Sequence, residues 1–207
     1  LWDLTKEQLS RTIFPLGNFE KSQIRKIAEE NNLIVYNKVE SQEICFIPND
    51  NYRQFLSTEF EKRNISIPTG DIIFRGKKIG EHKGYPFYTI GQRKGLGVSY
   101  SEPLFVKEID AVNNLIIVET EDNILSRGLI AVDYNFVNAE ELNYNKPYTI
   151  RIRYKDKGSL GYCKINNDNE LEIEFKEKRR AITPGQSAVI YDGDILVGGG
   201  IIKSAFD

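Results

Sequence analysis

Hydrophobic and polar positions change from a helical period to a period of two after about residue 70. Near the N-terminus, Thr5 and Gln8 have the spacing of a capping box, and apolar residues continue at helical spacing to Phe14. A second helix is predicted over residues 21–30, and the apolar run 33–36 predicts a short buried strand. Two helices followed by a buried strand indicate the tail of an α/β domain.

Strands dominate the remainder of the chain. A helix with one apolar side is predicted after residue 51, and the alternating segments 71–74 and 77–80 flank a tight turn. Beyond residue 103, short strands separated by turn residues predict a small closed barrel. We therefore predict an α+β multidomain fragment. Its parts are the helical tail of an α/β domain in residues 1–49, a small central domain in 50–102, and a C-terminal antiparallel β-barrel in 103–207.

Composition narrows the class of protein. A hydrophobic fraction of 40% and a charged fraction of 28% are typical of soluble globular domains, and no apolar run has the length of a membrane helix. The chain opens without a signal peptide. It also contains no Met, so we expect a fragment, a processed chain or an edited form of a longer protein. Two distant cysteines and one histidine exclude a disulfide scaffold and a structural zinc site, and a reducing cytoplasm is predicted.

The distribution of charge points to nucleic acid more than the net charge of −2 does. Residues 75–107 hold seven basic and two acidic residues, and residues 151–157 hold four basic and one acidic. Such local basic stretches are typical of phosphate-contacting surfaces, and they are also typical of solvated hairpins.

Cys45 has two interpretations. It follows the predicted strand 33–36, and ligands bind where the strands of an α/β domain end, so it is a candidate reactive thiol. It also lies between Ile44 and Phe46, and free cysteines are often small buried apolar residues. Local context alone favours the buried, inert thiol. Cys163 is predicted to lie in the core or wall of the barrel.

Three further segments carry candidate binding residues. The glycine-rich loop 91–97 presents Arg93 and Lys94, which suits either phosphate binding or a demanding structural loop, and it lacks a Walker motif. Alternation over 148–154 directs Tyr154 with the isoleucines to one face and Arg153 with Arg151 to the other. Residues 183–186 are predicted to form a turn that exposes the amide of Gln186 to a base or sugar, although the motif in isolation favours an ordinary structural turn of type II.

Taken together and in order, these motifs resemble the tRNA-specific 2-thiouridylase family. The segments that carry the resemblance are LGNFEK (16–21), IRKIA (24–28), SQEICFI (41–47), GEHKG (80–84), TIGQRKGLG (89–97), RIRY (151–154), ITPGQS (182–187) and GGGII (198–202). The resemblance covers nearly the whole chain, and the ordered set is far more specific than any one segment.

The resemblance implies an ATP-dependent sulfurtransferase that replaces the 2-oxygen of the wobble uridine in tRNA with sulfur. An N-terminal ATP-pyrophosphatase domain, with Mg²⁺ accompanying ATP, adenylates the uridine, and a separate protein donates persulfide sulfur. A persulfide on the second of two cysteines then delivers the sulfur, and the two cysteines pass through a disulfide. Because the reacting base is stacked in the anticodon, it must be flipped out first.

Matched to the family's motifs, Cys45 corresponds to the persulfide-bearing cysteine. Arg153, Tyr154 and Gln186 correspond to tRNA-contacting residues, and Arg93 and Lys94 are expected to contact RNA from their charge and position. The family's Ser-Gly-Gly-x-Asp-Ser loop and its first cysteine do not occur here. We therefore expect no cofactor to bind this fragment, and we expect it to be inactive alone.

Two rival hypotheses stay open. The chain could be a stand-alone RNA-binding β-barrel module without catalysis, since the basic stretches and the strands require no enzyme. Alternatively, Cys45 could be buried and inert, with the glycine-rich loop serving only as a turn.

Overall fold

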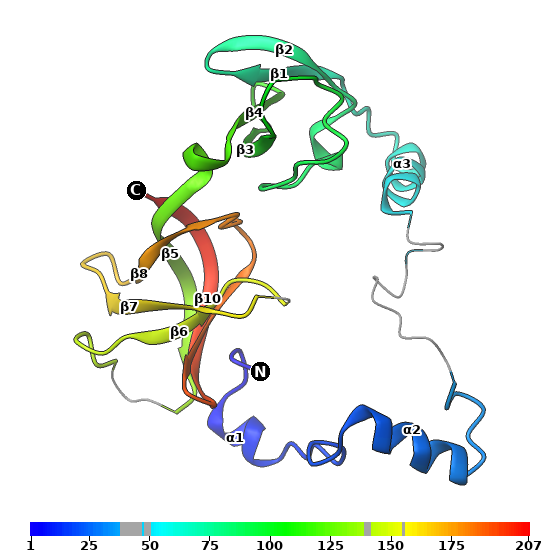
Figure 1. The fold of residues 1–207 in the computed structure, drawn as a ribbon, viewed down its shortest axis with the longest axis vertical. Coiled ribbons are helices and arrows are strands. Elements are labelled where there is room, and N and C mark those ends of the chain that lie inside the picture. The colour runs from blue at the N-terminus through cyan, green and yellow to red at the C-terminus, as the bar shows by residue number, and fades with distance from the viewer. Residues whose placement is uncertain (38–46, 48–50, 139–141, 155) are drawn as a thin grey trace. The chain divides into compact units, whose positions relative to one another are not determined.

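A computed structural model of the protein describes residues 1–37, 47, 51–138, 142–154 and 156–207 (Figure 1). The described residues form two compact units. One contains Leu1–Leu9 and Ile67–Asp207, and the other contains Ser10–Ser66. None of the described helices is long and apolar enough to cross a membrane.

The helices begin where the sequence predicts. Helix α1 (Lys6–Ser10) starts at a capping box. The Thr5 hydroxyl accepts from the Gln8 N–H at 3.1 Å, and the Gln8 side-chain oxygen accepts from the Thr5 N–H at 2.9 Å. Helix α2 (Lys21–Glu30) ends at two asparagines, the second with a φ of 54°. Helix α3 (Tyr52–Lys62) begins at Asn51, whose side chain accepts from the Gln54 N–H.

Two predictions in this region are wrong. The first helix stops at Ser10, so Phe14 lies outside it. Residues 33–36 form turns instead of a strand, with the side chain of Ile34 97% exposed. An apolar run forms a strand only beside another strand, and the described part of the Ser10–Ser66 unit contains none.

A four-stranded sheet follows, in the order β2-β1-β4-β3. Its strands are β1 (Gly70–Phe74), β2 (Lys77–His82), β3 (Leu104–Asp110) and β4 (Leu115–Thr120). β1 pairs with β4 in parallel, and the other pairs are antiparallel hairpins. Ile72, Val106 and Ile116 are fully buried in its core. The short 3₁₀ helix Tyr85–Phe87 lies between β2 and β3 in sequence, and the 3₁₀ helix Glu121–Ile124 follows β4.

His82 is a structural residue of this sheet. It is fully buried, and its Nδ1 accepts from the Gly84 N–H at 3.1 Å. Nε2 therefore carries the proton and donates to the Asn114 carbonyl at 3.0 Å. The ring thus joins the end of β2 to the turn between β3 and β4.

Six antiparallel strands close into a barrel in the order β10-β5-β8-β7-β6-β9, as predicted (Figure 1). The strands are β5 (Leu125–Phe136), β6 (Tyr148–Arg151), β7 (Ser159–Ile165), β8 (Leu171–Arg180), β9 (Ser187–Asp192) and β10 (Ile195–Phe206). Ile150, Ile173 and Ile190 fill the interior with no exposed surface. Cys163 lies among them, and burial raises the pKa of its thiol to about 12, so it is a core residue.

Strand pairing bears on where the central and C-terminal parts divide. A division between residues 102 and 103 would separate β1 and β2 from β3 and β4, although β1 and β4 share a parallel ladder. We propose that the division lies between Thr120 and Leu125, where both sheets stay whole. The N-terminal residues Leu1–Leu9 attach to the barrel, because the Asn135 side chain donates to the carbonyls of Trp2 and Leu4 at 2.7 and 3.0 Å.

Candidate functional site

The outer face of β6 and β9 carries a guanidinium stacked on an aromatic ring. Arg151 pairs with Val189 and Thr149 pairs with Tyr191, so all four side chains emerge on the same face of the two strands. The Arg151 guanidinium carbon lies 5.1 Å from the centre of the Tyr191 ring, within the range of a cation–π contact. Isoleucines between these positions point inward and anchor the face to the barrel core.

Three predicted site residues come together beside this pair. Arg153, Tyr154 and Gln186 line one hollow of about 410 Å³, which we call the aromatic hollow. The full lining is Arg151, Arg153, Tyr154, Gln186, Ser187, Val189 and Tyr191. Arg153 and Tyr154 are far from Gln186 in sequence, and only the pairing of β6 with β9 makes them neighbours.

The predicted alternation is wrong at one position. It directed Tyr154 inward with the isoleucines, but strand β6 ends at Arg151 and Tyr154 lies in the following turn. Its side chain is 97% exposed. A period of two holds only while the strand continues, so the turn presents both Arg153 and Tyr154 at the surface.

A tied turn presents Gln186. The Gln186 N–H donates to the Thr183 carbonyl at 3.2 Å, and Gly185 has the positive φ of 84° that a type II turn requires. The turn is fastened to β10, because Gly185 N–H donates to the Ile202 carbonyl and Ile202 N–H donates to the Gln186 carbonyl, both at 2.8 Å. The main chain of Gln186 is thus held in place while its amide side chain remains at the surface.

A buried carboxylate organises the turn that carries Arg153 and Tyr154. Asp156, whose side chain is only 6% exposed, accepts from the N–H groups of Ile152 and Gly158 at 3.1 Å. Both of its oxygens also accept from Nη2 of Arg179 on β8, at 2.7 and 2.8 Å. Burial alone would raise the pKa of Asp156, but these hydrogen bonds outweigh it and lower that pKa below its usual value.

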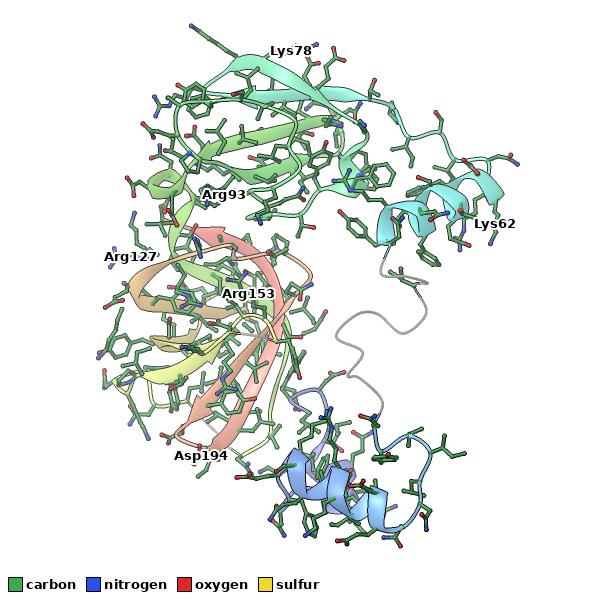
Figure 2. The ribbon with its side chains drawn as sticks, turned by 45° about the vertical axis from the view of Figure 1, so that its right-hand side comes forward. Lys62, Lys78, Arg93, Arg127, Arg153 and Asp194 are labelled. Atoms are coloured by element: carbon green, nitrogen blue, oxygen red, sulfur yellow. The ribbon has the colours of Figure 1, made fainter. Side chains whose placement is uncertain are left out.

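Arg93 and Lys94 do not line the aromatic hollow. Figure 2 shows Arg93 on the loop beside the four-stranded sheet and Arg153 on the barrel. Lys94 follows Arg93 on the same loop. Arg93 borders a separate hollow formed with residues 95–104. The loop is braced internally, because the Gln92 side chain accepts from the Thr89 N–H at 3.0 Å and donates to the Lys94 carbonyl at 2.9 Å.

Gly91 fits this loop against the barrel. It has a φ of 82°, and an added Cβ would lie 2.6 Å from the Cβ of Ala181. We expect Gly91→Ala to lower the free energy of unfolding by about 2 kcal/mol or more, through backbone strain and overpacking together. Gly97→Ala is the control, because Gly97 has a φ of 73° and open space around it, so only strain of about 1 kcal/mol applies. If urea unfolding showed that Gly91→Ala and Gly97→Ala lose the same free energy of unfolding, the proposed overpacking against Ala181 would be contradicted.

Cys45 lies outside the described residues, so its prediction stays a prediction. Sequence reasoning missed Tyr191 and the pair formed by Asp156 and Arg179 as site residues. Alternation along residues 187–191 carried a signal for Tyr191, because it places residues 187, 189 and 191 on one face. No local signal pairs Asp156 with Arg179, since the contact joins residues on different strands and turns.

Comparison with known proteins matches most of the chain to known domain types. Three family models match consecutive parts: a tRNA methyl transferase HUP domain over residues 1–49, a tRNA methyl transferase PRC-barrel domain over 53–120, and an aminomethyltransferase beta-barrel domain over 126–202. The PRC-barrel match ends at residue 120, where β4 ends, and the beta-barrel match starts at residue 126, one residue after β5 begins.

Curated relatives agree with the family models. A tRNA-specific 2-thiouridylase MnmA of Halothermothrix orenii is 43% identical over 206 residues, which cover 100% of this chain and 57% of the relative. The same enzyme of Clostridioides difficile is 41% identical over 99% of this chain and 56% of the relative. The chain therefore spans somewhat more than half the length of these relatives. It belongs to the tRNA-specific 2-thiouridylase family.

Proposed function

We propose that this chain is the part of a cytoplasmic tRNA 2-thiouridylase that holds the tRNA and carries the sulfur-delivering cysteine. The observation that supports it is the aromatic hollow, in which Arg153, Tyr154 and Gln186 meet although they come from separate segments. Each of these residues matches a tRNA-contacting position of the family by its motif. Their convergence on one face is what a shared ligand requires.

The chemistry of the aromatic hollow suits a nucleotide. A fully exposed tyrosine ring such as that of Tyr154 offers a stacking surface for any base. The guanidinium of Arg153 suits a phosphate or a base edge, and the amide of Gln186 both donates and accepts hydrogen bonds. Tyr191 adds a second ring, whose face carries Arg151.

In the proposed reaction, the terminal sulfur of a persulfide on Cys45 attacks C2 of the wobble uridine. The C2–S bond forms as the C2–O bond breaks, and the oxygen would leave with the adenylyl group as AMP. A second cysteine outside this chain then attacks the Cys45 sulfur, so the persulfide S–S bond breaks and the sulfur stays on the base. A persulfide is already a strong nucleophile at neutral pH, so this step needs little help from a general base.

ATP with Mg²⁺ would supply the adenylyl group that makes the uridine oxygen a leaving group, and a donor protein would supply the persulfide sulfur. We propose that residues outside this chain hold ATP and Mg²⁺, because the Ser-Gly-Gly-x-Asp-Ser loop that the family uses for ATP does not occur in it. Among the described residues, no group of three or more Asp, Glu, His or Cys side chains is placed to hold a metal ion.

Alanine variants of the aromatic hollow test the tRNA contact. We expect Tyr154→Ala and Gln186→Ala each to weaken tRNA binding, Tyr154→Ala by about 5- to 100-fold through lost stacking. Tyr144→Ala is the matched control, because Tyr144 is also an exposed tyrosine of the barrel but does not line the hollow. Affinities would be measured by titration of a transcribed tRNA with an unmodified wobble uridine. Unchanged affinity in both hollow variants would contradict the proposal.

A further inference from the structure

A second hollow shares Arg153 with the aromatic hollow. It measures about 460 Å³ and contains five basic side chains and one carboxylate, so we call it the basic hollow. Its lining is Leu125, Arg153, Asp156, Lys157, Gly158, Lys178, Arg179 and Arg180. The two hollows differ in chemistry, because the aromatic hollow contains two tyrosines and an amide and the basic hollow contains neither.

The positive charge of the basic hollow is only partly neutralised. Its carboxylate, Asp156, is fully engaged by Arg179 and by main-chain N–H groups. Arg153 and Lys157 form no ion pair with any residue that the structure describes. The positive potential is therefore available to an anionic ligand.

The two remaining cations have weak partners that lie outside the lining. Lys178 pairs with Asp207 at 3.7 Å, and Arg180 pairs with Glu121 at 2.6 Å. All four side chains of these pairs are more than half exposed, and such pairs contribute little to stability. A phosphate can therefore replace either carboxylate at small cost.

We propose that the basic hollow binds a backbone phosphate of the tRNA, adjacent to the nucleotide that occupies the aromatic hollow. This inference rests on the proposed function. Arg153 borders both hollows, so one strand of RNA passing over it would place a base against Tyr154 and a phosphate between Lys157 and Lys178. Contacts between cations and phosphates position the RNA backbone and carry no sequence information directly.

The site is also organised before any ligand arrives. Asp156 fastens the main chain on both sides of itself, at Ile152 and Gly158, and so holds the segment that carries Arg153 and Lys157. Arg179 ties this segment to β8, the strand that carries Lys178. Less conformational entropy is then lost when RNA binds.

The salt dependence of tRNA binding tests this inference on the full 207-residue chain. Lys157→Gln and Lys178→Gln each remove one exposed charge, and Lys164→Gln is the matched control. Lys164 lies near the C-terminal end of β7 and pairs with Glu172. The slope of log affinity against log salt is negative, and we expect each test variant to make it shallower by about one. The change should be equal for RNAs of different sequence, and the control should leave the slope unchanged.

A variant of the aromatic hollow separates the two kinds of contact. Tyr191→Ala should lower affinity and keep the salt slope of the unaltered chain, because it removes no charge. If the unaltered chain bound no tRNA at low salt, the proposed function itself would be overturned. If the unaltered chain bound tRNA but Lys157→Gln and Lys178→Gln showed the same salt slope as Lys164→Gln, only the proposed phosphate binding by the basic hollow would be overturned.

Discussion

Cys45→Ser in the full-length protein is expected to abolish thiolation of tRNA and to leave tRNA affinity unchanged. Serine cannot form a persulfide, so no sulfur would reach the uridine, and losing a covalent nucleophile costs about three orders of magnitude in rate or more. The tRNA contacts proposed here lie on the barrel and are more than 100 residues from Cys45 in sequence. Thiolated tRNA is measured by its retention in a gel that contains an organomercury compound.

The matched control is Cys163→Ser, which makes the same change in the barrel core. Cys163 is 1% exposed and its thiol has a pKa of about 12, so it is not available as a nucleophile. This variant should keep thiolation activity at temperatures where it stays folded, although burying a hydroxyl lowers its stability. Full thiolation by Cys45→Ser would contradict the catalytic assignment and would favour an RNA-binding module without catalysis.

Asp156→Ala is expected to have the largest effect on the barrel. It removes the partner of Arg179 and leaves two main-chain N–H groups without their acceptor. Breaking a buried ion pair costs about 3 kcal/mol in free energy of unfolding, at the low end of the known range because Arg179 is 22% exposed. The turn that carries Arg153 and Tyr154 loses its anchor, so tRNA affinity should fall as well.

Urea unfolding and tRNA titration measure the two effects. Asp194→Ala is the control, because Asp194 is an exposed aspartate in the turn between β9 and β10 (Figure 2). It should change neither stability nor affinity appreciably. Affinity is compared well below the unfolding temperature of each variant, where circular dichroism shows the native fold. A stable Asp156→Ala protein with unaltered tRNA affinity would contradict the role assigned to this carboxylate.

The pH dependence of stability gives an independent check on Asp156. Its pKa is lower in the folded chain than in the unfolded chain, where it is near 4. The stability that it contributes is therefore present above pH 4 and is lost as the pH falls through the folded value. The difference in stability between the unaltered chain and Asp156→Ala should be constant from pH 7 to 5 and should shrink toward pH 3.

Much of the barrel could be predicted from the sequence, because alternation and turn residues report which side of a strand is buried. The strands near Ile150, Ile173 and Ile190 were predicted for this reason, as was the burial of Cys163. The resemblance of ordered motifs also identified the family, which the comparisons confirm. The apolar run at residues 33–36 shows the limit, because a pattern predicts burial but cannot supply the strand beside it.

By itself, the sequence determined the strands of the barrel, the family and the residue types that suit RNA. Only the tertiary structure decided which of those residues share a surface. It placed Arg153 and Tyr154 beside Gln186 and left Arg93 elsewhere, because strand pairing joins β6 to β9 and not to the glycine-rich loop. It also paired Asp156 with Arg179, since a buried charge is stable only where the fold brings its partner.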